Sequence, residues 1–567
     1  MPQRMLLTRQ QPTVPSYYKS WGYTTAYVHP FQSSFYSRKR IYGQFNFDTM
    51  IFENDFTVPV STYGEYIDDN VVYNQIESLI ASSDEPLYLS DEFVMAVAES
   101  FANWLGARTG KYTNEITVSI GRDSRVSGPR IMAAAITALT AKGVKVYSCG
   151  LASTPAMFMS TLDLKCDGAI QITASHHPWE RNGLKFFTPD GGLEGENIAE
   201  LLKTAEEIYG KKYRAEPTLC VDNDYMKTYC LHLREMIKKG VNAENYNKPL
   251  EGFKIIVDAG NGVGGFYATD VLAPLGADIE GSQFLNPDGM FPNHIPNPEN
   301  AEAMDSVSKA TVASHADLGI IFDTDVDRAG CVENNGEEIN RNRLVALASY
   351  IALEGHDGGV IVTDSVTSDG LKEYIESIGG EHYRFKRGYR NVINKQIELN
   401  KAGKFCPLAM ETSGHAAFKE NYYLDDGAYL MTKIVILLAR DKSGEAIKSI
   451  LAPLKQPVEA KELRFSIKCD DFRAYGERII EELEKYYSDK DGWTIADDNR
   501  EGMRISADKD NGNGWLLLRL SVHDPVMPFN MESNEKGGVK KIAKSFYEFI
   551  KQFDKLDISP IENLLSE

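Results

Sequence analysis

Three segments of the chain combine an apolar strand pattern, a glycine-rich or polar turn and a helix pattern. They contain EITVSIGRDSR (115–125), EGFKIIVDAGNGVGG (251–265) and GGVIVTDSVTSDG (358–370). Strands that alternate with helices are joined by crossover connections, and they form parallel or mixed sheets. The residues after about 460 have a different pattern, which predicts a smaller α+β domain with an antiparallel sheet.

The length supports this division, because 567 residues are too many for one hydrophobic core. We expect the α/β fold class, with three similar mixed-sheet α/β domains plus a C-terminal α+β domain around a central cleft. The C-terminal domain is expected to act as a mobile lid. The expected bounds are a basic leader at 1–50, α/β domains at 51–245, 246–356 and 357–458, and the C-terminal domain at 459–567.

The composition argues against several classes of protein. A net charge of −20 disfavours nucleic acid binding, which depends on clustered Lys and Arg, and it gives no support for binding an anionic membrane. No run of 18 apolar residues occurs, so we expect no membrane span. Seven cysteines without a CxxC pair indicate a reduced compartment and no zinc site. An anionic ligand would therefore need a local basic pocket.

The N-terminal segment has its own composition. Residues 1–47 contain no Asp or Glu, six Lys or Arg, and many hydroxyl-bearing side chains. This pattern resembles an organellar transit peptide and suggests a plastid (chloroplast) protein. The alternative is a basic tail on a cytoplasmic protein.

Three aspartates alternate directly after an apolar strand in the segment IIFDTDVDR. Period-2 spacing in an extended segment points Asp323, Asp325 and Asp327 to one side, where their mutual repulsion requires a cation. A few hard oxygen ligands suit Mg²⁺, one ion per site. The alternatives are a solvated acidic loop or a calcium-binding turn. An EF-hand is excluded because its terminal Glu is missing.

A serine follows another apolar strand, in the segment TASHHPWERNGLK. Beside a divalent cation and the cationic Lys185 and Arg328, Ser175 could carry a phosphoryl group, since phosphoryl transfer depends on charge neutralisation. His176 could orient the serine or the phosphate, or it could be a buried structural imidazole.

The segments TASHHPxxxNGLK, DTDVDR, METSGH and RLSVHDP resemble, in this order, the four signature loops of the α-D-phosphohexomutase superfamily of phosphoglucomutases and phosphomannomutases. The similarity extends over roughly residues 88–555. It implies transfer of phosphate between C1 and C6 of a hexose through a phosphoserine. It also implies Mg²⁺ as cofactor, a sugar monophosphate as the small-molecule partner, and a hexose 1,6-bisphosphate as intermediate and activator.

The resemblance also assigns roles to single residues. Ser175 matches the phosphoserine, which completes the metal site of Asp323, Asp325 and Asp327. Arg328 would steady the phosphoryl group, and Arg122 lies in the loop that faces the serine. Lys185 would be the general acid/base, with a pKa that cationic neighbours and the metal lower.

Three further segments are assigned to the substrate. Glu411 and Ser413 would bind adjacent sugar hydroxyls, and Gly414 would let the backbone approach the sugar. Lys386 matches a lysine of the family, whereas Tyr389 stands where a histidine is common. Arg519, Ser521 and His523 would bind the non-reacting phosphate.

One departure from the family concerns residues 73–90. An Arg-Gly motif of the type SDIRG is expected there and does not occur. An inactive sugar-phosphate-binding relative is therefore an alternative to an active mutase. Within the enzyme class, we expect a mutase for glucose phosphate. The alternatives are a phosphomannomutase and a phosphoglucosamine mutase.

Overall fold

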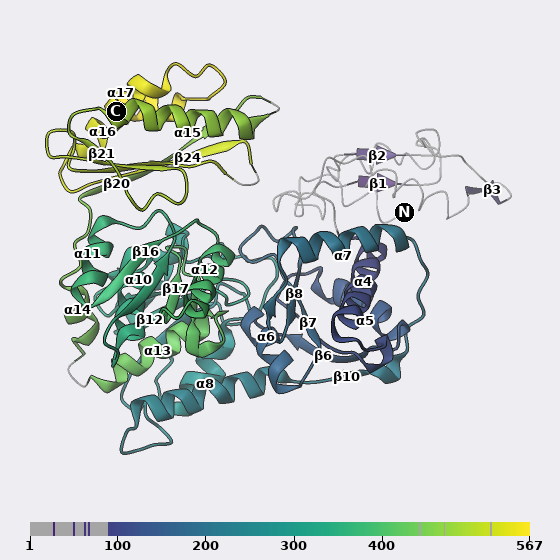
Figure 1. Cartoon of the computed structure of the whole chain (residues 1–567). Helices are drawn as coiled ribbons and strands as arrows, with labels where there is room; N and C mark the ends of the chain where they lie inside the picture. Colours follow the sequence, from purple (N-terminus) through teal and green to yellow (C-terminus); the bar gives the residue numbers. More distant parts are fainter. Residues whose placement is uncertain are drawn as a thin grey trace, which may run out of the picture. The chain divides into compact units, whose positions relative to one another are not determined.

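The computed structural model describes residues 89–441, 444–469, 471–521 and 524–567, together with four short strands within residues 26–67 (Figure 1). The chain divides into two compact units, Met1–Leu87 and Tyr88–Glu567. The remainder of the predicted leader at 1–50 lies outside the described residues. In the first unit the parallel pair is β1 (Ala26–Val28) with β2 (Thr49–Ile51), and the antiparallel pair is β3 (Thr62–Tyr63) with β4 (Tyr66–Ile67).

A six-stranded mixed sheet is the centre of the first α/β domain. Its order is β10-β6-β5-β7-β8-β9, in which the β7–β8 and β8–β9 pairs are antiparallel and the other pairs are parallel. The strands are β5 (Thr117–Arg122), β6 (Lys145–Leu151), β7 (Gly168–Ile172), β8 (Leu184–Thr188), β9 (Gly191–Gly192) and β10 (Cys220–Asp222). The helices are α4 (Asp91–Thr109), α5 (Gly128–Ala141), α6 (Thr154–Asp163), α7 (Gly195–Ile208) and α8 (Tyr225–Val241).

Helices cover both faces of this sheet because its strands are apolar on both sides. Ile170 and Ile172 of β7 pack in one apolar cluster with α4, α5 and α7, whereas Ala169 packs in another cluster with α6 and α8. Successive strand residues point to opposite faces, which accounts for this division. Helix α4 begins after Ser90, whose hydroxyl accepts the N–H of Phe93, and it ends at Gly110 in the left-handed conformation.

The second α/β domain has a smaller sheet, of order β11-β12-β13-β14. Residues 278–283 run parallel to β11 at its free edge through two isolated bridges. The helix expected after the glycine-rich turn is a π-helical turn, η8 (Tyr267–Leu272), followed by the 3-10 turn η9 (Ala273–Leu275). Pro274 and the left-handed Gly276 keep it short. The other elements are β11 (Ile255–Asp258), α9 (Ala301–Ser314), β12 (Leu318–Phe322), β13 (Ala329–Glu333), β14 (Glu338–Ile339) and α10 (Arg341–Leu353).

The third α/β domain contains a five-stranded sheet of order β16-β15-β17-β18-β19, with β16, β15 and β17 parallel and the last two pairs antiparallel. Its strands are β15 (Gly359–Thr363), β16 (Gly380–Arg384), β17 (Leu408–Met410), β18 (Ala416–Phe418) and β19 (Leu424–Asp425). Its helices are α11 (Asp369–Ser377), α12 (Tyr389–Lys401), α13 (Gly427–Arg440) and α14 (Ala446–Leu451).

The three α/β domains share one topology. In each domain one strand, β7, β12 or β17, pairs with the first strand in parallel and with the next strand of the chain in antiparallel orientation. The polar loops that begin at residues 173, 323 and 411 connect these antiparallel pairs. The same position of the repeated fold therefore carries the predicted serine, acidic and sugar-binding loops.

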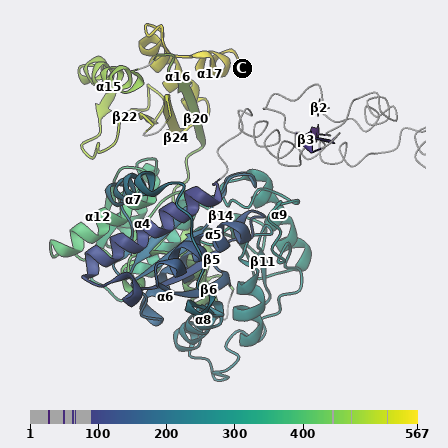
Figure 2. The same ribbon diagram turned by 90° about the vertical axis from the view of Figure 1, so that its right-hand side faces the viewer.

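The C-terminal domain is the expected antiparallel α+β domain. Its sheet has the order β20-β24-β23-β22-β21, and α15, α16 and α17 cover it (Figure 2). The loop that begins at Arg519 joins β23 to β24. The elements are β20 (Glu459–Ser466), α15 (Phe472–Ser488), β21 (Trp493–Ile495), β22 (Met503–Ala507), β23 (Gly514–Leu518), β24 (Val526–Ser533), α16 (Gly538–Ile550) and α17 (Ser559–Ser566).

The apolar cores show how these domains combine. One continuous cluster contains residues from all three α/β domains, whereas the C-terminal domain has a core of its own. The predicted fold class, three mixed-sheet α/β domains followed by an α+β domain, is confirmed. Among the described residues, no helix combines the length and the apolar character that a membrane span needs.

Candidate active site

Ser175 lies just beyond β7 with a backbone φ of 51°, a left-handed conformation that is uncommon for residues other than glycine. Its N–H donates to the Thr173 hydroxyl at 3.0 Å, and that hydroxyl donates to the buried Asp123 carboxylate at 2.8 Å. These contacts stabilise the strained turn. Such strain occurs often at functional sites, where the surrounding structure supports it.

Arg125 holds the rest of the serine loop in place. It is completely buried, and it forms an ion pair with Asp123 at 3.1 Å. Its guanidinium donates to four backbone carbonyls of the loop, at distances between 2.5 and 3.0 Å, including those of Ser175 and His177. A planar guanidinium with five donors can fix several carbonyl groups at once. The predicted Arg122, in contrast, donates to the Asp123 carbonyl at 3.0 Å.

The three predicted aspartates lie together and are buried. Asp323, Asp325 and Asp327 each offer an oxygen within 4.8 Å of the others. Oδ1 of Asp325 and Oδ1 of Asp327 have no hydrogen-bond partner. Buried polar atoms in native proteins almost always have partners, so these two oxygens point to a ligand. Val326 between them has a φ of 65°, a rare conformation for a β-branched residue.

This donor set fits a divalent cation with hard oxygen ligands. Burial and the two neighbouring carboxylates raise the pKa of Asp323 well above its usual range. Burial alone would also raise the pKa of Asp327, but the cationic groups around this carboxylate, Lys185 first among them, lower its pKa. A cation shared by all three carboxylates would relieve their repulsion. Because Mg²⁺ keeps open positions for water or phosphate oxygens, it suits this cluster.

The predicted serine and the acidic loop meet at the Ser175 hydroxyl. Its Oγ lies 3.0 Å from Asp323 Oδ2 and 3.0 Å from Arg328 Nη2. Arg328 is itself buried and forms an ion pair with Asp323 at 3.0 Å. A phosphoryl group on this oxygen would therefore lie between a guanidinium and the acidic cluster. The guanidinium supplies part of the charge neutralisation that phosphoryl transfer requires, and a cation held by the carboxylates would supply the rest.

Lys185 reaches the same cluster from β8. Its Nζ donates to Asp325 Oδ2 at 2.8 Å and to Asp327 Oδ2 at 2.6 Å. Burial alone would lower the pKa of Lys185, but these two carboxylates raise it well above its usual value. The lowered pKa that the sequence suggests depends on a bound metal, whereas the nearest charges of the protein itself are anionic. A cation bound by the same carboxylates would share their charge and oppose this rise.

His176 stays neutral beside the serine. Its Nδ1 lies 2.7 Å from Arg328 Nη2 and 3.4 Å from Ser175 Oγ. Burial and the Arg328 guanidinium lower the pKa of His176 to about 4. With Nδ1 as an acceptor, the imidazole can orient the arginine that contacts the serine.

Thr154 connects the first domain to the acidic loop. Its N–H donates to the Asp325 carbonyl at 2.9 Å, and its hydroxyl donates to Asp325 Oδ2. Thr154 is buried at the start of α6, after the N-cap residue Ser153. The positive end of this helix therefore faces the Asp325 carboxylate, which stabilises its charge. Thr154 is a positioning residue for the predicted metal ligand.

Replacing Thr154 by valine is expected to weaken Mg²⁺ binding about tenfold, as loss of hydrogen bonds to metal ligands typically does. Valine keeps the shape and removes the hydroxyl donor, whereas Thr154→Ser should retain most of the affinity. Calorimetric titration with Mg²⁺ measures both. Equal affinities in the wild type and the valine variant would show that the hydroxyl does not position Asp325.

The predicted sugar loop lies next to the acidic loop. Glu411 Oε1 accepts the N–H of Gly388 at 2.6 Å, and Oγ of the buried Ser413 has no hydrogen-bond partner. Burial and the nearby Asp364 raise the pKa of Glu411 to about 7. Gly414 has a φ of 96°, and a Cβ there would lie 2.7 Å from the Ala329 carbonyl oxygen, so its close approach is to β13.

The predicted phosphate loop of the C-terminal domain is described in part. Arg519 is buried, its Nη1 lies 3.7 Å from Glu501 Oε1, and its Nε has no hydrogen-bond partner. The Ser521 hydroxyl accepts the N–H of Asp524 at 3.3 Å. His523 lies outside the described residues. Lys386 is exposed.

Short contacts join the four loops across the domains. Arg328, which touches Ser175, lies 3.9 Å from Glu299, and Arg387 lies 3.4 Å from the same carboxylate. The Arg387 N–H donates to Glu501 at 3.1 Å, and Glu501 contacts Arg519. Residues of all four domains therefore form one polar site.

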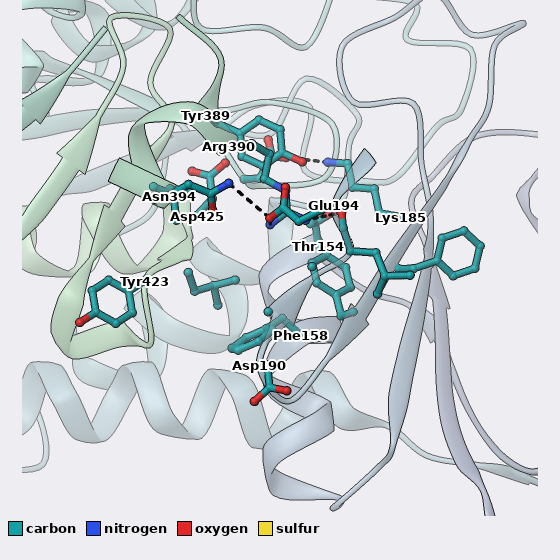
Figure 3. A pocket seen from close by; sticks show the side chains of 18 of the residues that line it. Thr154, Phe158, Lys185, Asp190, Glu194, Tyr389, Arg390, Asn394, Tyr423 and Asp425 are labelled. Atoms are coloured by element: carbon teal, nitrogen blue, oxygen red, sulfur yellow. Dashed lines mark hydrogen bonds and ion pairs between the residues drawn. The ribbon is translucent and has the colours of Figure 1, made fainter. Parts of the chain in front are cut away.

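A cavity of about 280 Å³ adjoins this site between β8 and α12 (Figure 3). Lys185 and Tyr389 lie at the top of the view and Asp190 at the bottom. Ser175, Glu411 and Arg519 are not among its lining residues. The cavity therefore reaches Lys185 without being the place where a sugar phosphate would contact all four loops.

Several residues of this site escaped the sequence reasoning. Arg125 stands in the same GRDSR segment as Arg122, so the second arginine was an available signal. Arg387 is the neighbour of the predicted Lys386 in the same segment. Thr154 and Glu501 belong to no recognised motif, and their contacts with Asp325 and with the Arg387 N–H join different domains. No sequence signal identified these two.

The matches to known protein families occur in the order of the three α/β domains. Residues 80–210, 227–336 and 340–456 match the models of domains I, II and III of phosphoglucomutase/phosphomannomutase. A model described as sulfatase matches residues 3–91, most of which lie outside the described residues. The stretch 73–90, which lacks the expected Arg-Gly motif, falls within that match.

Individual relatives support the same assignment. A phosphomannomutase/phosphoglucomutase of Pseudomonas syringae is 30% identical over 80% of this chain and 91% of its own length. A phosphoglucomutase/phosphomannomutase of Thermococcus kodakarensis is 31% identical over 79% and 92%. The crystal structure of a Burkholderia thailandensis member, 26% identical, superposes with a TM-score of 0.67 over 82% of this chain and 94% of its own. The chain belongs to the phosphoglucomutase/phosphomannomutase family of the α-D-phosphohexomutase superfamily.

Proposed function

We propose that the protein is a phosphohexomutase that interconverts hexose 1-phosphate and hexose 6-phosphate, with glucose phosphate as the main substrate. The observation that carries this proposal is the position of the Ser175 hydroxyl, 3.0 Å from both Asp323 and Arg328. The family assignment and the two unpartnered aspartate oxygens support it. The bound metal would be Mg²⁺, which neutralises charge on the phosphoryl oxygens.

The residues of the site would support two half-reactions. In the first, a sugar hydroxyl attacks the phosphorus of phosphorylated Ser175, a new P–O bond forms, and the bond to the Ser175 oxygen breaks. Lys185 is placed to exchange the hydroxyl proton, and Arg328 steadies the transferred group. The resulting hexose 1,6-bisphosphate turns over, and its other phosphate returns to Ser175. Arg519 would hold whichever phosphate is not reacting.

Coupled assays with the 1-phosphates of glucose, mannose and glucosamine test the proposal. We expect turnover of glucose 1-phosphate to be fastest and mannose 1-phosphate to be accepted, because Glu411 and Ser413 would read hydroxyls that these two sugars share. Mass spectrometry should find one phosphoryl group on the peptide that contains Ser175. Absence of both turnover and phosphorylation would favour an inactive sugar-phosphate-binding relative, the reading that the missing Arg-Gly motif raises.

A pH dependence follows from the pKa of about 7 at Glu411. The ionised carboxylate accepts sugar hydroxyls, so protonation weakens binding. We expect KM to rise about tenfold per pH unit below 7, the limiting slope for loss of one required ionised group. The substrate phosphate also titrates near pH 6. Glu411→Gln isolates the side chain, since its KM should be high and should lack the component near pH 7. An unchanged pH profile in that variant would contradict the assignment.

A further inference from the structure

The Glu501 carboxylate occupies a position built from three donors. Its Oε1 lies 3.7 Å from the Arg519 guanidinium, and its Oε2 accepts the backbone N–H of Arg387 at 3.1 Å and the hydroxyl of Ser365. A guanidinium, a hydroxyl and a backbone N–H are the donors that proteins use for phosphate. Glu501 therefore lies where a phosphate group could bind.

The fold brings these donors together. Ser365 follows β15 and Arg387 follows β16, and these two strands are parallel neighbours, so both residues lie at the same edge of the sheet. Ligands of open α/β sheets bind at this edge, beyond the carboxyl ends of the strands. From the C-terminal domain, Gly502 packs so tightly that a Cβ would lie 2.1 Å from the Leu518 carbonyl oxygen. This close approach fixes Glu501 beside Arg519.

One donor at this position is not used. Nε of Arg519 has no hydrogen-bond partner among the described residues, and the residue is only 7% exposed. An unpaired buried guanidinium nitrogen costs free energy unless a ligand completes it. Glu501 contacts the Nη1 atom of Arg519 and leaves Nε free. A phosphate, with three terminal oxygens, can satisfy both nitrogens.

The negative charges beside Arg387 and Arg519 oppose the binding of a phosphate. Arg387 and Arg519 provide two positive charges, and three carboxylates face them: Glu299 at 3.4 Å and Asp364 at 3.8 Å from Arg387, and Glu501. Asp364 is buried and accepts the Thr412 hydroxyl at 2.8 Å, so it is fixed. Glu501 and Glu299 are partly exposed and can move. A phosphate dianion would therefore displace a glutamate.

We propose that the phosphate that is not reacting binds in place of the Glu501 carboxylate, held by Arg519 together with Arg387 and Ser365, and that Glu501 competes with it. This inference rests on the proposed function and adds three residues to its phosphate site. It assigns Arg387, the neighbour of the predicted Lys386, to substrate binding. The same carboxylate links the third domain to the fourth through Ser365 and the Arg387 N–H.

Calorimetry on the full chain tests the proposal, with inorganic phosphate and glucose 1-phosphate as probes and Ser175→Ala as the non-reacting background. Arg387→Ala should weaken both ligands by tenfold or more, about the effect of losing a charge-assisted hydrogen bond. The affinity of Arg387→Lys should lie between those of the wild type and of Arg387→Ala. Glu501→Gln should bind both ligands several-fold more tightly, because the competing charge is gone. Arg478→Ala, which removes an exposed arginine of α15, is the matched control and should change neither.

Unchanged affinity in Arg387→Ala, or unchanged or weaker affinity in Glu501→Gln, would overturn the proposal. If Glu501→Gln does not fold, Glu501→Asp withdraws the carboxylate by one methylene and should also tighten binding. Inorganic phosphate binds without any turnover, so the subsite and the proposed function can fail separately. If the wild type binds phosphate as described but converts no hexose phosphate, only the proposed function is refuted. If the wild type is active but the variants bind phosphate with unchanged affinity, only the phosphate subsite is refuted.

Discussion

Replacing Ser175 by alanine is expected to abolish turnover of hexose phosphates, with kcat falling on the order of 10⁴-fold or more, as removal of a covalent nucleophile does in other enzymes. The hydroxyl is the group that would carry the phosphoryl, and no other hydroxyl in the described residues is recorded in contact with both Asp323 and Arg328. Binding of glucose 1-phosphate should change little, because Arg519 and Glu411 remain. Steady-state assays and calorimetry measure the two effects.

Ser413→Ala is the matched control for this experiment. It removes another buried hydroxyl, one that lies in the sugar loop. Its expected effect is a higher KM with kcat largely kept, since that hydroxyl would contribute to binding. Appreciable turnover by Ser175→Ala would show that Ser175 is not the phosphoryl carrier.

Local sequence patterns identified the polar loops of the candidate site because each loop is contiguous. Asp323, Asp325 and Asp327 lie within five residues, and their alternation after a buried strand places them on one side. The strand patterns likewise predicted three mixed sheets, since apolar runs followed by polar turns are local features. The π-helical turn at Tyr267–Leu272 was not predicted, because a helix pattern does not distinguish it from an α-helix.

Contacts between domains could not be predicted in this way. Thr154 and Asp325 are 171 positions apart, and Arg387 and Glu501 are 114 positions apart. The carboxylate partners of Lys185, Asp325 and Asp327, likewise come from another domain. The shared topology explains why such contacts form: three loops at equivalent positions of a repeated sheet meet when the three domains share one core.

Removal of divalent cations is expected to lower kcat on the order of 10³-fold, because a metal contributes several kcal/mol of charge stabilisation in phosphoryl transfer. Added Mg²⁺ should restore activity and also raise Tm. At about 100 times its Kd, a ligand that binds only the folded state adds about 2.7 kcal/mol of stability. The three buried aspartates provide a further reason, since a bound cation relieves their repulsion. Chelation followed by assay and thermal unfolding measures both effects.

The Tm response separates metal binding from catalysis, and Asp325→Asn provides the control. This variant keeps the shape of the side chain but removes a charge from the centre of the cluster, so Mg²⁺ should raise its Tm much less. Lys185→Met should behave in the opposite way: its activity should fall, but its Tm should respond to lower Mg²⁺ concentrations, because the ammonium no longer competes for Asp325 and Asp327. Full activity after chelation, or a wild-type Tm that Mg²⁺ leaves unchanged, would refute a metal site at these carboxylates. A Lys185→Met variant that needs more Mg²⁺ than the wild type would mean that the lysine helps to hold the cation site instead of competing with it.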